Sequence, residues 1–552
     1  MSEETTSSYR LEKTKRHYHS WVVNETLEDY SLRYAPKSFR RWSEFTVANA
    51  ALGGISYLAD FAIGGSIAIS SGFTNSFWAI IISAIIIFLT GIPISYYASK
   101  YNIDMDLLTR GAGFGYIGST LTSVIYASFC FIFFALEGAI MAQALELYFH
   151  LPLAWGYLLC TIAIFPLVVF GMTLLATMQV WTQPVWLIGM FAPWFAVLMK
   201  DPTAFSTWTN FAGKSPSGSG FNILLCASGA GVALSLIAQI GEQVDYLRFM
   251  PDLTTRNKTK WWWAVMAAGP GWVILGAWKQ LAGGFFTSIA VKHGVEMAKA
   301  NEPIQMYIEG FKAIFSNPAI YLFLATFFVI LSQVKINVTN AYSGSLSWSN
   351  FFSRLTHAHP GRVVWLVFHL IIALTLQELG VFNVLLWVLG FYSNVAIAWV
   401  GALVADLVIN KPLGFSPSYI EFKRAHLYNF NPVGFGSMMI ASVISVIAFF
   451  GFMGPVAQAF STLIALGLSM ILSPIIAIIT KGKYYIARKD VHFHDNLEIV
   501  GLTQCKICEH EYEKEDMAYC PVYDVSICSL CCSLDAQCHD SCKALPNSVL
   551  TT

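Results

Sequence analysis

Eight of the 11 cysteines in this 552-residue chain lie close together, between residues 505 and 542. Four of them form two pairs with a Cys-x2-Cys spacing, Cys505 with Cys508 and Cys528 with Cys531. Two such pairs with a gap of this length are typical of a four-cysteine zinc site. An iron–sulfur cluster is the weaker alternative, because paired knuckles with a long gap suit zinc better. The spacing therefore predicts a structural zinc site with no open position for catalysis.

The same segment holds enough further ligands for a second tetrahedral site, interleaved with the first. We expect four ligands from the set Cys520, Cys532, Cys538, His539 and Cys542. The alternative is a group of disulfides, which a reducing cytoplasm would disfavour. Residues 501–545 are too few to bury a core of their own, so metal would supply most of their folding free energy.

Charged side chains within long apolar segments are a second group of residues that could bind a ligand or an ion. A charge at bilayer depth is expensive and normally faces a cavity or a partner. The alternative is an interhelical pair or a side chain that reaches the membrane interface. The charged residues are Asp60, Glu137, Glu242 and Lys335, and Gln239, Gln243, Gln333 and Asn337 lie near them in sequence.

The composition shows what must position these groups. Hydrophobic residues make up 56% of the chain, charged residues only 12%, and the mean hydropathy is +0.56. Soluble domains carry about 25% charged residues, so the chain is expected to be an all-α polytopic membrane protein. Its formal net charge of zero gives no bulk attraction to nucleic acid. We find no nucleotide-binding loop or nucleophile motif, so no enzymatic activity is expected.

Hydropathy predicts about twelve membrane spans, with eleven as the alternative because the ninth is short. Residues 1–44 are polar and lack a signal peptide, residues 45–480 form the membrane domain, and 481–500 form a basic linker to the cysteine-rich tail. The expected spans are 45–70, 77–99, 118–148, 152–174, 181–199, 223–241, 262–290, 317–343, 363–377, 380–408, 434–452 and 455–478.

Lysine and arginine collect in alternate connections, beginning with the N-terminal segment and ending after the twelfth span. The opposite connections are short or nearly uncharged, except for 291–316, where three lysines are balanced by three glutamates. Basic loops stay on the cytoplasmic side. We therefore predict a multi-pass protein of the inner or plasma membrane with both termini in the cytoplasm.

Glycine clusters suggest breaks in the first and sixth spans. The first span contains Gly53-Gly54 and then Gly64-Gly65, and the sixth contains 228–231 and then 239–242. The alternative is ordinary close packing of helices at glycine. Breaks at equivalent positions are typical of transporters built from two inverted repeats, here spans 1–5 and 6–10, with the site between them.

Four segments in this order resemble the nucleobase:cation symporter-1 family, which includes purine-cytosine, allantoin and hydantoin permeases. They are AIGGSIAISSG in the first span, NIDMDLLTRGAGFGYIGS after the second, GEQVDYLRFMP after the sixth and YNFNPVGF before the eleventh. The resemblance covers roughly residues 28–480. It implies the leucine-transporter fold, with ten core helices in two inverted repeats plus two more, and secondary transport of a nucleobase or related nitrogen compound.

The resemblance also implies a site. A planar base would lie between aromatic side chains of the third and sixth helices, and amide side chains would read its edge. The expected substrate residues are Phe131, Phe134, Glu137, Gln239, Glu242, Gln333 and Asn337. The sequence departs from the family in lacking an aromatic residue near Leu236, while Glu137 could bind two adjacent N–H groups of a solute.

Sodium-coupled relatives are expected to hold the ion with backbone carbonyls of the first helix and hydroxyls of the eighth. Thr339 could supply a hydroxyl, but Lys335 places a fixed positive charge in the same region. An ammonium can replace a cation electrostatically. We therefore expect H+ coupling or uncoupled binding rather than Na+ coupling, with Asp60, Glu137 or Glu242 as titrating groups.

The tail sequence ICSLCCSLDAQCHDSC is similar to a segment of hybrid sensor kinases, in which it joins a permease-like membrane domain to signalling modules. Two functions therefore compete. The first is a transporter for a nucleobase-like solute. The alternative is a transporter-like sensor that relays ligand occupancy to a histidine kinase through its zinc tail.

Overall fold

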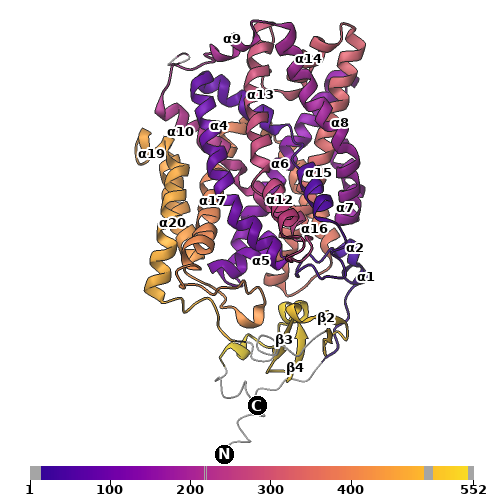
Figure 1. Ribbon diagram of the computed structural model, residues 1–552, viewed down its shortest axis with the longest axis vertical. Coiled ribbons are helices and arrows are strands. Elements are labelled where there is room, and N and C mark those ends of the chain that lie inside the picture. Colours follow the sequence, from indigo (N-terminus) through magenta and orange to yellow (C-terminus); the bar gives the residue numbers. More distant parts are fainter. Residues whose placement is uncertain (1–13, 217, 219, 490–500, 545–552) are drawn as a thin grey trace, which may run out of the picture.

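The computed structural model describes residues 14–216, 218, 220–489 and 501–544. Long helices run side by side along the long axis of the molecule, and a small module with β-strands is attached at one end (Figure 1). The N-terminal segment lies at this same end, where Arg33 pairs with Asp516 of the module. The two terminal segments thus share one end of the helical body, while the side of the membrane they face stays a prediction.

The first half of the helical body begins with a broken helix. Ser43 caps the start of helix α3, where its hydroxyl accepts a hydrogen bond from the backbone amide of Thr46. The helix ends at the glycine pair Gly53-Gly54. Helix α4 then holds the rest of the first predicted span and all of the second, joined at Gly72 with φ of 75°. The elements are α3 Glu44–Gly53, α4 Ala59–Tyr101, α5 Met105–Thr109, α6 Ser119–Phe149, α7 Leu153–Val169, α8 Gly171–Lys200 and α9 Ala204–Thr209.

The second half packs against the first along two extensive contacts, α15 along α6 and α13 along α4. Its elements are α10 Ile223–Ala233, η3 Leu234–Ala238, α11 Gln239–Leu247, α12 Lys258–Ala268, α13 Trp272–Lys292, α14 Pro303–Ile314, α15 Pro318–Thr356, α16 Arg362–Glu378 and α17 Leu385–Ala405. Helices α18 Gly434–Phe449, α19 Pro455–Ala459 and α20 Ser461–Thr480 follow, and α18 and α20 pack on α17.

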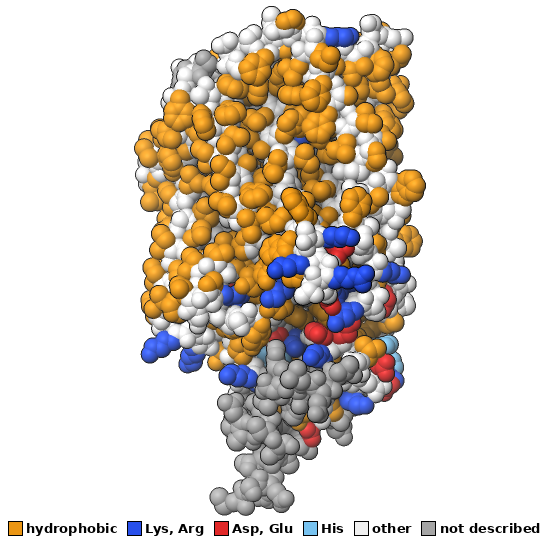
Figure 2. Space-filling model, viewed as in Figure 1, with side chains coloured by type: hydrophobic (Ala, Val, Ile, Leu, Met, Phe, Trp, Pro, Cys, Tyr) orange, Lys and Arg blue, Asp and Glu red, His pale blue; other side chains and the backbone are white. Residues whose placement is uncertain are grey.

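Every predicted span is mostly helical, and seven helices among the described residues are long and apolar enough to cross a membrane. Hydrophobic side chains cover most of the face in Figure 2, while lysine and arginine gather toward the end that carries the module. The expected multi-pass membrane protein is confirmed at this level. The seven helices are Ala59–Tyr101, Ser119–Phe149, Gly171–Lys200, Ile223–Leu247, Pro318–Thr356, Val381–Asn410 and Ser461–Thr480.

The expected breaks are present but differ in position and degree. The chain leaves the helix between Gly54 and Leu58, directly after the first glycine pair, whereas Gly64 and Gly65 lie inside continuous helix α4. These two glycines instead permit close packing, because a Cβ on Gly64 would lie 1.9 Å from the carbonyl oxygen of Gln280. In the sixth span the helix tightens to a 3-10 turn, η3, between the two glycine-rich segments.

The module at the end of the chain contains two small antiparallel hairpins, so the molecule is not purely helical. Strand β1 (Leu502–Gln504) pairs with β2 (Glu511–Glu513), and β3 (Met517–Cys520) pairs with β4 (Val525–Cys528). The short helix α21 (Ser529–Ser533) follows β4 directly. The N-terminal segment is also structured, with helices α1 (Ser20–Val23) and α2 (Glu25–Glu28) beside the module and the helix ends.

Candidate functional site

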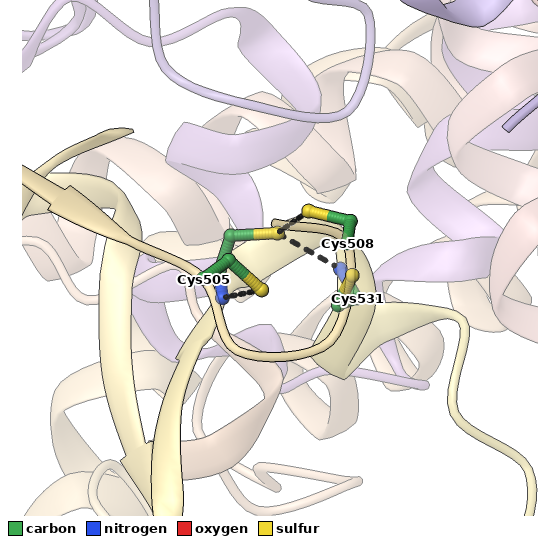
Figure 3. Close-up of side chains that lie close together, drawn as sticks. Cys505, Cys508 and Cys531 are labelled. Atoms are coloured by element: carbon green, nitrogen blue, oxygen red, sulfur yellow. Dashed lines mark hydrogen bonds between the residues drawn. The ribbon is translucent and has the colours of Figure 1, made fainter. Parts of the chain in front are cut away.

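The two Cys-x2-Cys pairs meet at one point of the module, as their spacing predicted. Cys505 and Cys508 flank the turn between β1 and β2, Cys528 ends β4, and Cys531 lies in α21. All four are buried, and their sulfur atoms lie within 4.8 Å of one another (Figure 3). Four converging thiols of this kind match the donor set of a closed tetrahedral zinc site.

Backbone amides and neighbouring thiols form hydrogen bonds with sulfur atoms of this cluster. The backbone amide of Cys528 donates to Cys505 Sγ at 3.3 Å, and that of Cys531 donates to Cys528 Sγ at 3.4 Å. Hydrogen bonds from the other three thiols lower the pKa of Cys505. The hydroxyl of Tyr18 lies 2.8 Å from Cys531 Sγ, so the N-terminal segment contacts the cluster directly.

The remaining tail cysteines gather around a second point. Cys520, Cys532, Cys538 and Cys542 line a single cavity of about 10 Å³. Burial raises the pKa of Cys532 to about 12 and that of Cys542 to about 11. His539, the fifth predicted ligand, is exposed and is not part of this lining. Among the described residues only the first cluster has its sulfurs as close as a metal requires, so the second site stays a prediction.

No tail cysteine forms a disulfide within the described residues, since all eight are free thiols. The disulfide alternative therefore has no support from their arrangement.

The tail is held on the membrane domain by arginine side chains. The Arg424 guanidinium, between α17 and α18, donates to the carbonyl oxygen of Cys532 at 3.0 Å and to Asp540 at 2.9 Å. Arg16 donates to the carbonyl oxygens of Cys531 and Leu534, both at 3.0 Å. These contacts join the metal-ligand segment to both the N-terminal segment and the membrane domain.

In the membrane domain, Glu137 and Gln333 meet at the break in the first span, and their role in a ligand site stays a prediction. Glu137 on α6 accepts from the backbone amides of Leu58 at 3.3 Å and Ala59 at 3.1 Å. Gln333 on α15 donates to the same carboxylate. Both side chains are fully buried. The carboxylate thus lies at the N-terminus of α4, where free amides and the helix dipole favour negative charge.

Asn337 lies one helical turn beyond Gln333 and therefore on the same face of α15. Its side-chain oxygen accepts from Asn340 at 3.3 Å, while its amide nitrogen is buried without a hydrogen-bond partner in the described structure. A buried donor of this kind is costly unless a ligand or water satisfies it. Asn337 therefore supports a binding role beside Gln333.

Gln239 and Glu242, the predicted sixth-helix residues, pair with each other. The Gln239 amide donates to the Glu242 carboxylate at 2.8 Å, and both are buried on α11. No hydrogen bond joins them to Glu137 within the described structure, although the Glu242 and Glu137 carboxyl groups interact electrostatically, so their place in a ligand site stays a prediction.

Phe131 and Phe134 make their ring contacts elsewhere. The ring of Phe131 stacks on Trp348 at 6.4 Å, and that of Phe134 meets His369 edge-on at 6.0 Å. These partners lie on α15 and α16, so both rings take part in packing between scaffold helices. Stacking of a base on them stays a prediction.

The ammonium group of Lys335, a predicted ion-coupling residue, has hydrogen-bond partners on α8, the helix of the fifth predicted span. It donates to Gln179 Oε1 and to Thr182 Oγ1 of α8, each at 2.8 Å. Thr339 belongs to the same cluster, because the side-chain nitrogen of Gln179 donates to the Thr339 hydroxyl at 3.4 Å. A Cβ on Gly54 would lie 3.0 Å from the Thr339 hydroxyl, so this cluster borders the break in the first span.

Asp60 has a partner that the sequence did not indicate. Lys279 on α13 approaches the Asp60 carboxylate at 2.9 Å, and both side chains are fully buried. Gln280 donates to the other carboxylate oxygen at 2.9 Å. The signal that could have identified Lys279 is its position inside the apolar seventh span, where a charge requires a partner.

The GEQVDYLRFMP segment closes the end of the bundle that carries the tail. Arg248 donates to the carbonyl oxygen of Asp29 and to the hydroxyl of Tyr342, each at 2.8 Å. The Tyr126 hydroxyl donates to Asp245 at 2.7 Å. All five residues are buried, so these contacts join α11, α6 and α15 to the N-terminal segment.

A pocket lies in the half of the bundle away from the tail. A cavity of about 420 Å³ lies between α4, α10, α17 and the last helices. Its lining includes Ser70, Ser71, Ser228, Trp387 and Thr462. Its volume lies in the range of small-molecule pockets.

Comparisons with known proteins identify the fold. No protein-family profile and no curated protein sequence matches the chain. The membrane domain is similar to Mhp1, a nucleobase-cation-symport-1 family transporter, in a closed conformation with bromovinylhydantoin bound, with a TM-score of 0.57, 16% identity, and coverage of 82% of this chain and 99% of that one.

Two further structures extend the comparison. The inward-facing conformation of Mhp1 matches with a TM-score of 0.51 at 15% identity, covering 86% of this chain and 96% of that one. A substrate-bound, outward-open Na+-coupled sialic acid symporter matches with a TM-score of 0.54 at 13% identity, covering 83% and 92%. The predicted transporter fold is therefore confirmed.

Proposed function

We propose that this chain is a secondary transporter that carries a nucleobase-like nitrogen heterocycle across the membrane by alternating access. The observation that carries this proposal is the convergence of Glu137 and Gln333 on the broken first span, because such breaks are where transporters of this architecture bind their solutes. The fold shared with symporters supports it.

The chemistry of the cluster favours a ring with neighbouring N–H and C=O groups. A carboxylate accepts two adjacent N–H donors, and a primary amide both donates and accepts. Glu137 would take the N–H groups, Gln333 would bind alongside, and the unpartnered Asn337 nitrogen would donate to a ring carbonyl. Each of these groups is buried, so the contacts would form in a water-poor site.

The two ends of the bundle support alternating access. The Arg248 network closes the end that carries the tail, and the cavity of about 420 Å³ lies in the opposite half. We propose that the solute enters through that half, reaches the break in the first span, and leaves after the Arg248 network opens.

Purified full-length protein tests this proposal in two steps. Thermal-shift screening against purines, pyrimidines, hydantoins and guanidine-type compounds identifies a ligand, and counterflow in proteoliposomes measures its transport. We expect exchange of the labelled ligand that Glu137→Gln abolishes and Glu146→Gln, on an exposed site of the same helix, preserves. Binding without any counterflow would contradict transport.

A zinc-bearing tail is part of the proposal. Cys505, Cys508, Cys528 and Cys531 fit a tetrahedral ion by donor type and convergence. The apolar core of the module is small, so we propose that zinc bound there supplies much of the folding free energy of the module.

A second candidate function is a sensor, favoured by the contacts of the tail with helix ends. Arg424, Lys423 and His357 of the membrane domain all reach tail carbonyl groups. A shift of these helix ends on ligand binding would reach the tail, and from it a signalling partner such as a histidine kinase. Hydrogen exchange of residues 501–544 with and without ligand separates the two, since a sensor requires a ligand-dependent change that Arg424→Ala removes.

A further inference from the structure

The ammonium group of Lys279 lies where the broken first span exposes its carbonyl groups. Its Nζ donates to the carbonyl oxygen of Ile55 at 2.6 Å and to that of Tyr57 at 3.0 Å. The Asp60 carboxylate lies 2.9 Å away, so three oxygens surround the group within 3.0 Å. The face of the Tyr57 ring lies 3.5 Å from the same nitrogen.

These oxygens are available because the helix stops. Residues between Gly54 and Leu58 leave the helical conformation, so their carbonyls lack helical partners. In transporters with interrupted helices, such carbonyls and half-helix ends coordinate the coupling cation. A lysine ammonium has three donors and no acceptor, and here two carbonyls and a carboxylate match that capacity.

The opposite end of the break is also occupied by the chain itself. The first amides of α4 donate to Glu137, which places an anion at the positive end of the half-helix. One side of the break therefore holds an internal cation and the other an internal anion. Lys335 binds Gln179 Oε1 on α8, and the side-chain nitrogen of Gln179 lies 3.4 Å from Thr339, the hydroxyl that could otherwise have served a sodium ion.

We infer that Lys279 permanently replaces the coupling cation at the break, so that this chain needs no sodium ion there to organise its first span. This inference deepens the proposed function, but it concerns the empty carrier and is testable without a solute. Asp60 serves as the counter-ion that keeps Lys279 at this position, and Gln280 fixes the Asp60 carboxylate.

Thermal unfolding of the full-length protein in NaCl, KCl and choline chloride at equal ionic strength tests the inference. For the wild type we expect the same melting temperature in all three salts. Lys279→Ala leaves the carbonyl oxygens without their donor, so we expect a lower melting temperature in choline chloride and partial recovery in NaCl. Lys292→Ala, an exposed lysine at the end of the same helix, should behave as the wild type.

Two outcomes would overturn the inference: sodium-specific stabilisation of the wild type, or a Lys279→Ala protein whose melting temperature is unchanged in every salt. If Lys279→Ala does not fold, equilibrium binding of radioactive sodium to the wild-type protein tests the inference instead. Saturable sodium binding contradicts the inference, and its absence supports it. A failed ligand screen would leave these results untouched, so the two proposals fail separately.

Discussion

The cysteine tail and the broken first span solve the same problem in different ways. Each gathers polar groups in a buried place where water cannot satisfy them. In the tail, four thiols from a stretch of fewer than thirty residues converge on one point in an arrangement that could hold a metal ion. At the break, Lys279, Glu137 and Gln333 come from three different helices and satisfy the backbone with the chain's own charges.

The difference concerns what holds each region together. The tail buries a small apolar core that includes Val22 and Leu32 of the N-terminal segment, and we propose that a bound metal ion supplies the rest of its stability. The broken span lies inside a bundle that buries it from all sides, so an internal lysine and glutamate suffice. We therefore expect the tail to depend on metal and the membrane core to depend on individual buried charges.

Removal of metal should have the largest effect, and only on the tail. Structural zinc contributes about 10–16 kcal/mol in small zinc modules, so chelation should unfold residues 501–544. Elemental analysis should give about two zinc ions per chain, falling by one in Cys508→Ser and by one in Cys542→Ser, with His539→Ala unchanged because its side chain is exposed. Less than one zinc per chain would contradict the expectation that the tail, unlike the membrane core, depends on metal.

Loss of the buried carboxylate should have the next largest effect, and only on ligand binding. Glu137→Gln keeps the shape but removes the charge that N–H donors would meet, so we expect at least about tenfold weaker binding, roughly 1.4 kcal/mol. Isothermal calorimetry with the ligand from the screen measures this, with Glu146→Gln as control. An unchanged dissociation constant would place the site elsewhere.

Gln239→Ala should be milder than Glu137→Gln. The Gln239 amide bonds to Glu242 on its own helix, so its removal leaves a buried carboxylate with one partner fewer and does not touch the Glu137 cluster. We expect binding to weaken by less than about tenfold. A larger loss in the same calorimetric titration would extend the ligand site to α11.

Truncation after residue 490 should have the smallest effect on ligand affinity. The tail contacts the helix ends and the N-terminal segment, whereas the Glu137 cluster lies within the bundle. We expect the dissociation constant to stay within about twofold, below 0.5 kcal/mol. A larger change in a folded truncated protein would show that the tail and the site are coupled, which favours the sensor.

Features that depend on local spacing and composition could be predicted from the amino-acid sequence. The helical membrane class followed from hydropathy, the first break from Gly53-Gly54, and the first metal cluster from two Cys-x2-Cys pairs. In each case the residues that matter are neighbours along the chain, so their relation is fixed before the chain folds. Glu137 and Gln333 were also found, because a charge or amide in an apolar span stands out.

Which distant groups meet could be seen only in the folded protein. Lys279 bonds to carbonyls more than two hundred residues away, and nothing in its own neighbourhood indicates that the first span will break beside it. Phe131 and Phe134, expected from the family resemblance, contact α15 and α16, and His539, expected from its place among the cysteines, lies outside the lining of the second cysteine group. The physical reason is that helix rotation and packing, which set the direction of each side chain, depend on all neighbouring helices at once.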